Sequence, residues 1–311
     1  MHIKKISYII ASRNDNYCGD SVGRLQTTLN HTGSILKSHG VLEDSEIILT
    51  DWASPETNGP LRNTLRLNEE ARSILKIAEV PFGVAKRYQK DSPFSEVHAM
   101  NVGFRKSRGK FFARIDQDTL IGNRFVKWFY EDFYRQIDSP PEVKLAFSGR
   151  RNLSKDQSLD YKNWVLKEDK SHLVEICHPN NYYSRILPHK KNMFMFYGGA
   201  VGVMMVERDL FLKEKGFNED FIYMNNMDTE FMNRLRNHSL VYNLGLRVQA
   251  DFYHLNHERN DGAADDISQP HADQDGCRLT NDLTIRSQKI ENKNSDDWGL
   301  NKEDIKVYKF V

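Results

Sequence analysis

Two carboxylates, Asp116 and Asp118, stand directly after the apolar run at residues 111–115, with only Gln117 between them. A run of that composition predicts a buried strand, and the alternation of an extended backbone would place both side chains on the same side. Two carboxylates at this spacing suit a hard divalent cation such as Mg²⁺ or Mn²⁺, which can also hold a diphosphate. The same pattern is common in solvated turns, so its meaning depends on the elements around it.

Those elements alternate regularly along the first part of the chain. The sequence predicts strands at residues 6–11, 46–50, near 84–88 and 111–115, and helices at 21–38, 61–78 and 95–107. Such alternation indicates a parallel sheet covered on both faces, in which ligands bind beyond the carboxyl ends of the strands. Arg13, Asp51 and the Asp116/Asp118 pair all follow strands at that edge.

The rest of the chain is less regular. Residues 150–192 are polar with one predicted helix near 160–168, and residues 193–206 are apolar around Gly198 and Gly199. Helices are predicted at 208–215 and 227–236, and a strand at 246–255. The polar tail from Asp261 onward is expected to wrap the surface.

Composition excludes several classes of function. The 311 residues carry a net charge of +1, from 44 basic and 43 acidic side chains, so no overall field favours a polyanion such as nucleic acid. Three scattered cysteines give neither a disulfide framework nor a zinc site. No transmembrane segment or signal peptide is evident. We expect a cytoplasmic protein, which would act at a membrane only peripherally.

Several motifs, in order from residue 6 to residue 257, resemble the family 2 glycosyltransferases with a GT-A fold. The first two strands and their loops match, as does the Asp-x-Asp strand. The other matching segments are Asn101-Val102-Gly103, Arg108-Gly109-Lys110-Phe111, the galactosyltransferase-type segment from Gly198-Gly199-Ala200 to Phe221, and Met227-Asp228 through Arg234-Leu235. Two positions depart from the family pattern: Met227 stands where Glu is usual, and the second strand ends in Asp51-Trp52-Ala53-Ser54 instead of Asp-Asp-Gly-Ser.

The resemblance implies an α/β fold of the GT-A type, with a Rossmann-like, mostly parallel central sheet flanked by helices. It implies one catalytic domain over 1–260, with a nucleotide-sugar-binding half at 1–122 and an acceptor-binding half at 123–260. A C-terminal extension at 261–311 would pack on that domain at the acceptor side.

The resemblance also assigns residues to ligands. The nucleotide sugar would contact Ala11, Arg13, Asp51, Asn101, Asp116, Gln117, Gly198 and Gly199. The metal, Mn²⁺ or Mg²⁺, would be held by Asp116, Asp118 and a histidine, His254 before His257. Residues three apart on an extended segment point to opposite sides, so both histidines could bind one ion only if the chain turned between them.

Asp228 is the predicted general base of an inverting transfer. In this reaction a hydroxyl of a glycan, lipid-linked or protein acceptor attacks a nucleotide sugar, and UDP is the commonest donor nucleotide in the family that the sequence resembles. Structural alternatives stay open for these residues. Asp228 could cap its helix, Arg13 and Asp51 could form an ion pair, and Gly198-Gly199 could make a tight turn. Two other functions stay open as well, a nucleotidyltransferase that makes nucleotide sugars and a non-catalytic carbohydrate-binding protein with this fold.

Overall fold

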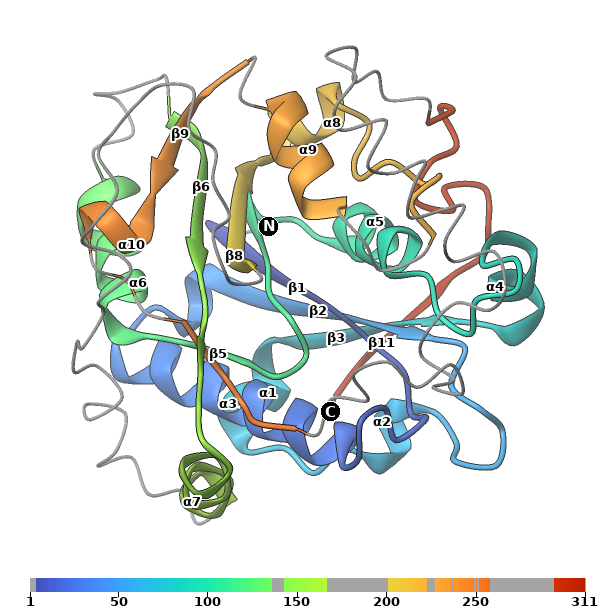
Figure 1. Ribbon diagram of the computed structural model, residues 1–311, viewed down its shortest axis with the longest axis horizontal. Helices are drawn as coiled ribbons and strands as arrows, with labels where there is room; N and C mark the ends of the chain where they lie inside the picture. Colours follow the sequence, from blue (N-terminus) through green and yellow to red (C-terminus); the bar gives the residue numbers. More distant parts are fainter. Residues whose placement is uncertain are drawn as a thin grey trace.

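The computed structural model describes residues 4–135, 143–166, 201–222, 227–235, 238–248, 250, 252–257 and 294–310. Its centre is an eight-stranded sheet in the order β11-β3-β2-β1-β4-β8-β6-β9 (Figure 1). β1 pairs in parallel with both β2 and β4, and β2 pairs in parallel with β3. The strands are β1 Ile6–Ser12, β2 Ser45–Trp52, β3 Leu75–Val80, β4 Phe111–Arg114, β6 Val143–Gly149, β8 Val201–Glu207, β9 Leu240–Asn243 and β11 Lys306–Lys309.

Helices cover both faces of this sheet because the side chains of its strands alternate. Tyr8 and Ile10 of β1 enter one core with Leu25 of α1, whereas Ile9 enters a second core with Met100 of α5. The helical elements are α1 Ser21–Ser38, η1 Leu42–Asp44, α2 Leu61–Thr64, α3 Glu69–Ile74, α4 Phe82–Tyr88, α5 Glu96–Lys106, α6 Asn123–Lys127, η2 Trp128–Phe133, α7 Lys155–Leu166, α8 Arg208–Lys213, α9 Met227–Leu235 and α10 Leu244–Arg247. The fold is therefore α/β with a large, mostly parallel sheet flanked by helices, as the sequence predicts.

A second sheet of three short strands lies next to the end of β4. It consists of β5 Thr119–Ile121, β10 Phe252–His254 and β7 Arg151–Asn152, in the order β5-β10-β7. β5 follows the Asp116/Asp118 loop directly, and β10 runs antiparallel to it. This small sheet brings distant parts of the chain to the loop after β4.

Three sequence predictions of secondary structure are wrong. The predicted helix at 61–78 is α2, α3 and then β3, because Asn68 caps α3 through its side chain and residues 75–80 continue as a buried strand. The predicted strand near 84–88 is α4, which begins after Pro81. Among the described residues of the predicted strand at 246–255, Phe252–His254 forms a strand, whereas residues 246 and 247 belong to α10, Leu244–Arg247.

The C-terminal segment at 294–310 returns to the main body. β11 pairs antiparallel with β3 at the edge of the large sheet, and Trp298 packs into the core beside α5. Among the described residues, no helix has the length and apolar character needed to cross a membrane.

Candidate metal centre and neighbouring carboxylates

The loop between β4 and β5 makes a turn instead of continuing as a strand. The N–H of Thr119 donates a hydrogen bond to the carbonyl of Asp116 at 3.1 Å, which closes the turn. Thr119 then lies opposite His254 in the β5–β10 pairing, and the N–H of Leu255 donates to the carbonyl of Asp118 at 2.9 Å. Backbone pairing thus fixes Asp118 beside the end of β10.

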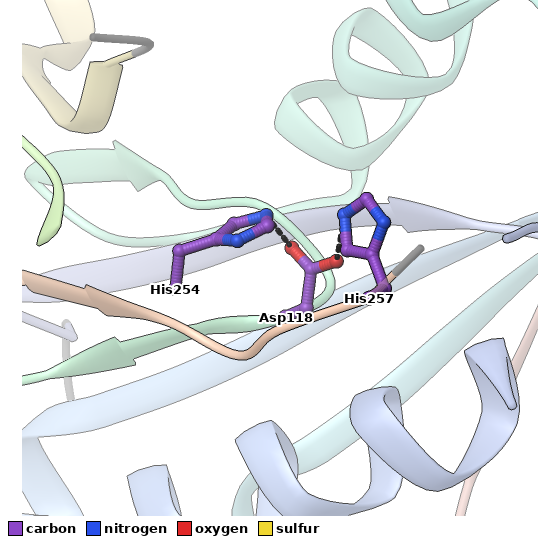
Figure 2. A group of neighbouring side chains, drawn as sticks. All are labelled: Asp118, His254 and His257. Atoms are coloured by element: carbon purple, nitrogen blue, oxygen red, sulfur yellow. Dashed lines mark ion pairs between the residues drawn. The ribbon is translucent and has the colours of Figure 1, made fainter. Parts of the chain in front are cut away.

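Asp118, His254 and His257 form a compact group of three side chains (Figure 2). His254 Nε2 lies 3.0 Å from Asp118 Oδ1, and His257 Nε2 lies 3.6 Å from Asp118 Oδ2. β10 ends at His254, so the chain leaves the extended conformation before His257 and both imidazoles face the same carboxylate. One oxygen or nitrogen from each residue lies within 4.8 Å of the others, a spacing that could hold a metal ion.

A buried arginine lies against the other side of this group. Arg24 of α1 is 1% exposed, and its Nε lies 3.4 Å from Asp118 Oδ2. The same guanidinium donates to the carbonyls of Tyr17, Cys18 and Gly19, which ties the loop after β1 to the site. Burial by itself would raise the pKa of Asp118, but the hydrogen bond from His254 and the charges of His254, His257 and Arg24 lower that pKa to about 2. Asp118 is therefore ionised at neutral pH.

Asp116 faces a different set of partners. Because of the turn, the two carboxylates do not share one side of an extended strand, which corrects the sequence expectation. Arg114 Nη2 lies 2.8 Å from Asp116 Oδ1, and Arg150 pairs with Asp116 Oδ2. Among the described residues, the ion pairs of Asp116 are thus with arginines, whereas those of Asp118 include both histidines.

Arg114 also contacts Asp228 and Glu96. Its Nη1 lies 3.4 Å from Asp228 Oδ2, and its Nη2 lies 2.7 Å from Glu96 Oε1. Arg114 is 5% exposed and is the last residue of β4. One guanidinium therefore joins carboxylates from α5, the β4–β5 loop and α9.

Asp228 is the second residue of α9, which begins at Met227, so it does not occupy the capping position before the helix. Its Oδ2 faces Arg114, while its Oδ1 is buried without a hydrogen-bond partner among the described residues. Burial raises the pKa of Asp228, and the nearby Asp116 adds to the rise, whereas Arg114 and Arg150 oppose it. A carboxylate with one held oxygen and one unpartnered oxygen can accept a proton from a nearby hydroxyl.

The residues predicted to contact the nucleotide sugar have varied surroundings. Asp51 is fully buried, its Oδ1 accepts from Ser54, and its Oδ2 accepts from the N–H of Leu61 at 2.8 Å. Burial raises the pKa of Asp51 despite these hydrogen bonds. Arg13 donates to the carbonyl of Pro93 and lies 3.8 Å from Asp15, so the alternative ion pair with Asp51 is not formed.

Asn101 is fully buried in α5 and holds the segment after α8. Its side-chain oxygen accepts from the N–H of Phe217 at 2.9 Å, and its amide donates to Phe217 and Glu219. Gln117 accepts from Ser12 at 2.5 Å, and Ala11 is 8% exposed in β1. Gly198 and Gly199 lie outside the described residues. Donor contacts for all of these residues stay predictions.

Arg24, Glu96, Arg114 and Arg150 were not identified from the sequence as site residues. An arginine at the end of the apolar run 111–114 is a usable signal, because a charge within a buried strand requires partners. Arg24 lies on a helix among residues that become buried, which periodicity alone does not distinguish from a solvated position. Glu96 and Arg150 carry no comparable signal.

Comparison with known proteins shows the fold. No protein-family model matches the sequence, and no curated protein matches it in a sequence search. A crystal structure of S. aureus TarS, residues 1–349, matches over 92% of this chain and 73% of that one, with 14% identity and a TM-score of 0.50. The same fragment in complex with UDP-GlcNAc matches over 93% and 68%, with 13% identity and a TM-score of 0.45.

The catalytic domain of Drosophila β1,4-galactosyltransferase 7 in complex with xylobiose covers 94% of this chain and 83% of its own, with 15% identity and a TM-score of 0.47. TarS and this galactosyltransferase are GT-A glycosyltransferases. The chain has a GT-A glycosyltransferase-like fold, as its motifs predict.

Proposed function

We propose that this chain is an inverting, divalent-metal-dependent glycosyltransferase of the hexosyltransferase type. It would move a sugar from a nucleotide-sugar donor to a hydroxyl of a glycan, lipid-linked or protein acceptor. The observation that carries the proposal is the group formed by Asp118, His254 and His257 at the carboxyl end of β4, within a GT-A-like fold. That end of a strand is where open α/β sheets bind ligands.

The donor set of this group fits a divalent transition metal. A carboxylate oxygen suits Mg²⁺ and Mn²⁺ equally, but imidazole nitrogen is a poor ligand for Mg²⁺. Two histidines beside one aspartate therefore favour Mn²⁺ as the ion held by Asp118, His254 and His257. When bound, such an ion neutralises the charge that develops on a departing diphosphate.

The proton chemistry is assigned to Asp228. Its unpartnered Oδ1 would take the proton of the acceptor hydroxyl, whose oxygen forms the new bond to the anomeric carbon as the bond to the diphosphate breaks. Because this is a single displacement, no covalent intermediate on the protein is needed. A raised pKa makes the carboxylate a stronger base near neutral pH.

UDP-linked sugars are the first donors to test. The S. aureus TarS fragment has also been crystallised with UDP-GlcNAc. The loop at residues 12–19 carries one glycine and one arginine, which is little for holding the triphosphate that a nucleotidyltransferase binds. Donor hydrolysis is therefore a more direct assay than nucleotide-sugar synthesis.

The test is hydrolysis of a panel of nucleotide sugars, measured with Mn²⁺, with Mg²⁺ and with EDTA. We expect release of nucleoside diphosphate from one class of donor, and its loss with EDTA. Activity that survives EDTA would contradict the metal dependence. Formation of nucleotide sugar from a nucleoside triphosphate and a sugar phosphate would instead indicate a nucleotidyltransferase. Donor binding without any turnover would indicate a non-catalytic protein.

Asp228→Asn tests the base. We expect donor affinity close to that of the wild type and turnover reduced by at least about 100-fold, the lower end of what removal of a general base costs. Asp209→Asn is a matched control, because Asp209 is also the second residue of a helix, α8, but is exposed. Near-wild-type turnover in Asp228→Asn would exclude this assignment.

A further inference from the structure

Arg114 is a buried cation whose guanidinium contacts three carboxylates from three different elements. Glu96 comes from the first turn of α5, Asp116 from the β4–β5 loop and Asp228 from α9. Asp116 has a second cationic partner, Arg150. For Asp228, Arg114 is the one ion-pair partner among the described residues.

The two carboxylate oxygens of Asp228 have different contacts. Oδ2 faces Arg114 Nη1 at 3.4 Å, and Oδ1 is buried without a hydrogen-bond partner in the described part of the chain. The planar guanidinium offers several donors in fixed directions, so it can hold one oxygen while leaving the other available. A lysine would carry the charge without this fork.

Removal of Arg114 would leave three carboxylates close together, and Arg150 would be their one remaining cationic partner in the described part of the chain. Like charges in a poorly solvated site repel strongly, so Asp228 and Asp116 would move apart. This movement would alter the position of the base relative to the donor. Displacement of a reacting group by about 1 Å can cost about 100-fold in rate.

We propose that Arg114 is a positioning residue, which fixes the base Asp228 relative to the donor-side carboxylate Asp116. This inference rests on the proposed function, because it assumes that Asp228 accepts the proton. Arg114 itself touches no reacting atom. Glu96 serves as the anchor that holds the guanidinium on the α5 side.

A double-mutant cycle distinguishes positioning from a general structural role. The variants are Arg114→Gln, Asp228→Asn and the two combined. Each is assayed by donor hydrolysis with Mn²⁺; UDP-GlcNAc is the first donor tried, and the donor of the panel that the wild type hydrolyses fastest is then used for all variants. We expect Arg114→Gln to lower kcat by about 100-fold while the donor Kd changes less than about threefold. If Arg114 acts through Asp228, the double variant should be no slower than Asp228→Asn alone.

Two outcomes overturn the inference. Near-wild-type kcat in Arg114→Gln would show that the base does not need this contact, and multiplying losses in the double variant would show that Arg114 acts independently of Asp228. Arg208→Gln is the control, since this half-buried guanidinium lies elsewhere, against Phe104 and the carbonyl of Gly109. We expect its kcat to equal that of the wild type.

Milder variants cover the case in which Arg114→Gln does not fold. Arg114→Lys keeps the charge, and Glu96→Gln keeps the arginine but removes the charge of its anchor. Both should lower kcat, by about tenfold or more, and neither should slow Asp228→Asn further. Unchanged kcat in both would overturn the inference. An active Asp228→Asn variant, or no turnover of any donor, would instead indicate failure of the proposed function.

Discussion

His254 Nε2 lies 3.0 Å from Asp118 Oδ1, and the pairing of β10 with β5 produces this contact. The histidine ends one strand while the aspartate immediately precedes the other, so the backbone hydrogen bonds of a sheet set their separation. His257 reaches the same carboxylate from beyond the end of β10, at 3.6 Å. The two imidazoles are therefore held with different rigidity.

This difference predicts unequal contributions to metal affinity. We expect His254→Ala to weaken Mn²⁺ binding by more than about 100-fold, because loss of a ligand should exceed the 10–100-fold cost of losing an outer partner. His257→Ala should weaken it by about tenfold, since a loop ligand is more easily replaced by water. Isothermal titration calorimetry measures both affinities. His39→Ala, beside Asn123, is the control, and an equal or larger loss in His257→Ala would contradict the ranking.

A second prediction is that the two aspartates of the β4–β5 loop contribute differently to Mn²⁺ binding. Asp118→Asn should abolish measurable Mn²⁺ binding by the donor-free protein, because its carboxylate faces both imidazoles. Asp116→Asn should bind Mn²⁺ within about threefold of the wild type, because in this structure its oxygens face Arg114 and Arg150. Electron paramagnetic resonance of free Mn²⁺ measures both. Equal losses in the two variants would place Asp116 among the ligands of the donor-free protein.

The sequence predicts correctly those elements whose pattern of apolar and polar residues fits one type of secondary structure along its whole length. Apart from Ser7, residues 6–11 are apolar or β-branched, and they lie within β1; α1 occupies the predicted 21–38. The secondary structure predicted for residues 61–88 is wrong because short helices and strands follow one another there, without a long periodic run. There, the Asn68 cap and Pro81 set boundaries that helical spacing does not reveal.

In the candidate site, too, some residues could be predicted from the sequence and others could not. Asp118, His254 and Asp228 could be nominated from residue type, order and family resemblance. Their partners could not, because the β5–β10 pairing and the turn at Asp116 depend on contacts between distant segments. A sequence also does not show that Arg114 and Arg24 become buried counter-charges. Such residues are found only when the strands and helices around them are placed.

A third prediction concerns acid stability and rests on His31. This side chain is 2% exposed in α1, its Nε2 lies 2.6 Å from the carbonyl of Ile121, and its Nδ1 faces the hydroxyl of Tyr161. Burial lowers the pKa of His31 to about 4, although the hydrogen bond to Ile121 acts in the opposite direction. The unfolded chain takes up this proton near pH 6.5, and the folded chain does so only near pH 4.

The free energy of unfolding should therefore fall as the pH drops from about 6.5 to about 4, by up to about 3 kcal/mol from this residue. Burial also lowers the pKa of His98 to about 4, so a second residue contributes to the same slope. In His31→Gln the slope should become shallower, as measured by urea unfolding across this range. An unaltered slope in His31→Gln would contradict the prediction.

A last prediction tests how the C-terminal segment is held. Trp298 is 3% exposed, its ring centroid lies 5.8 Å from those of both Phe104 and Phe211, and the Arg105 guanidinium lies 3.9 Å above it. Trp298→Ala removes a large side chain from this core and should lower the free energy of unfolding by about 3–5 kcal/mol in urea titrations.

Phe82→Ala is the matched control, because this aromatic side chain is 61% exposed, and its effect should stay within about 0.5 kcal/mol. The segment is also anchored by the pairing of β11 with β3, so hydrogen exchange of those β3 amides that face β11 should accelerate in Trp298→Ala if the anchor is released. A loss below about 1 kcal/mol, with unchanged exchange in β3, would show that the segment at 294–310 contributes little to the fold.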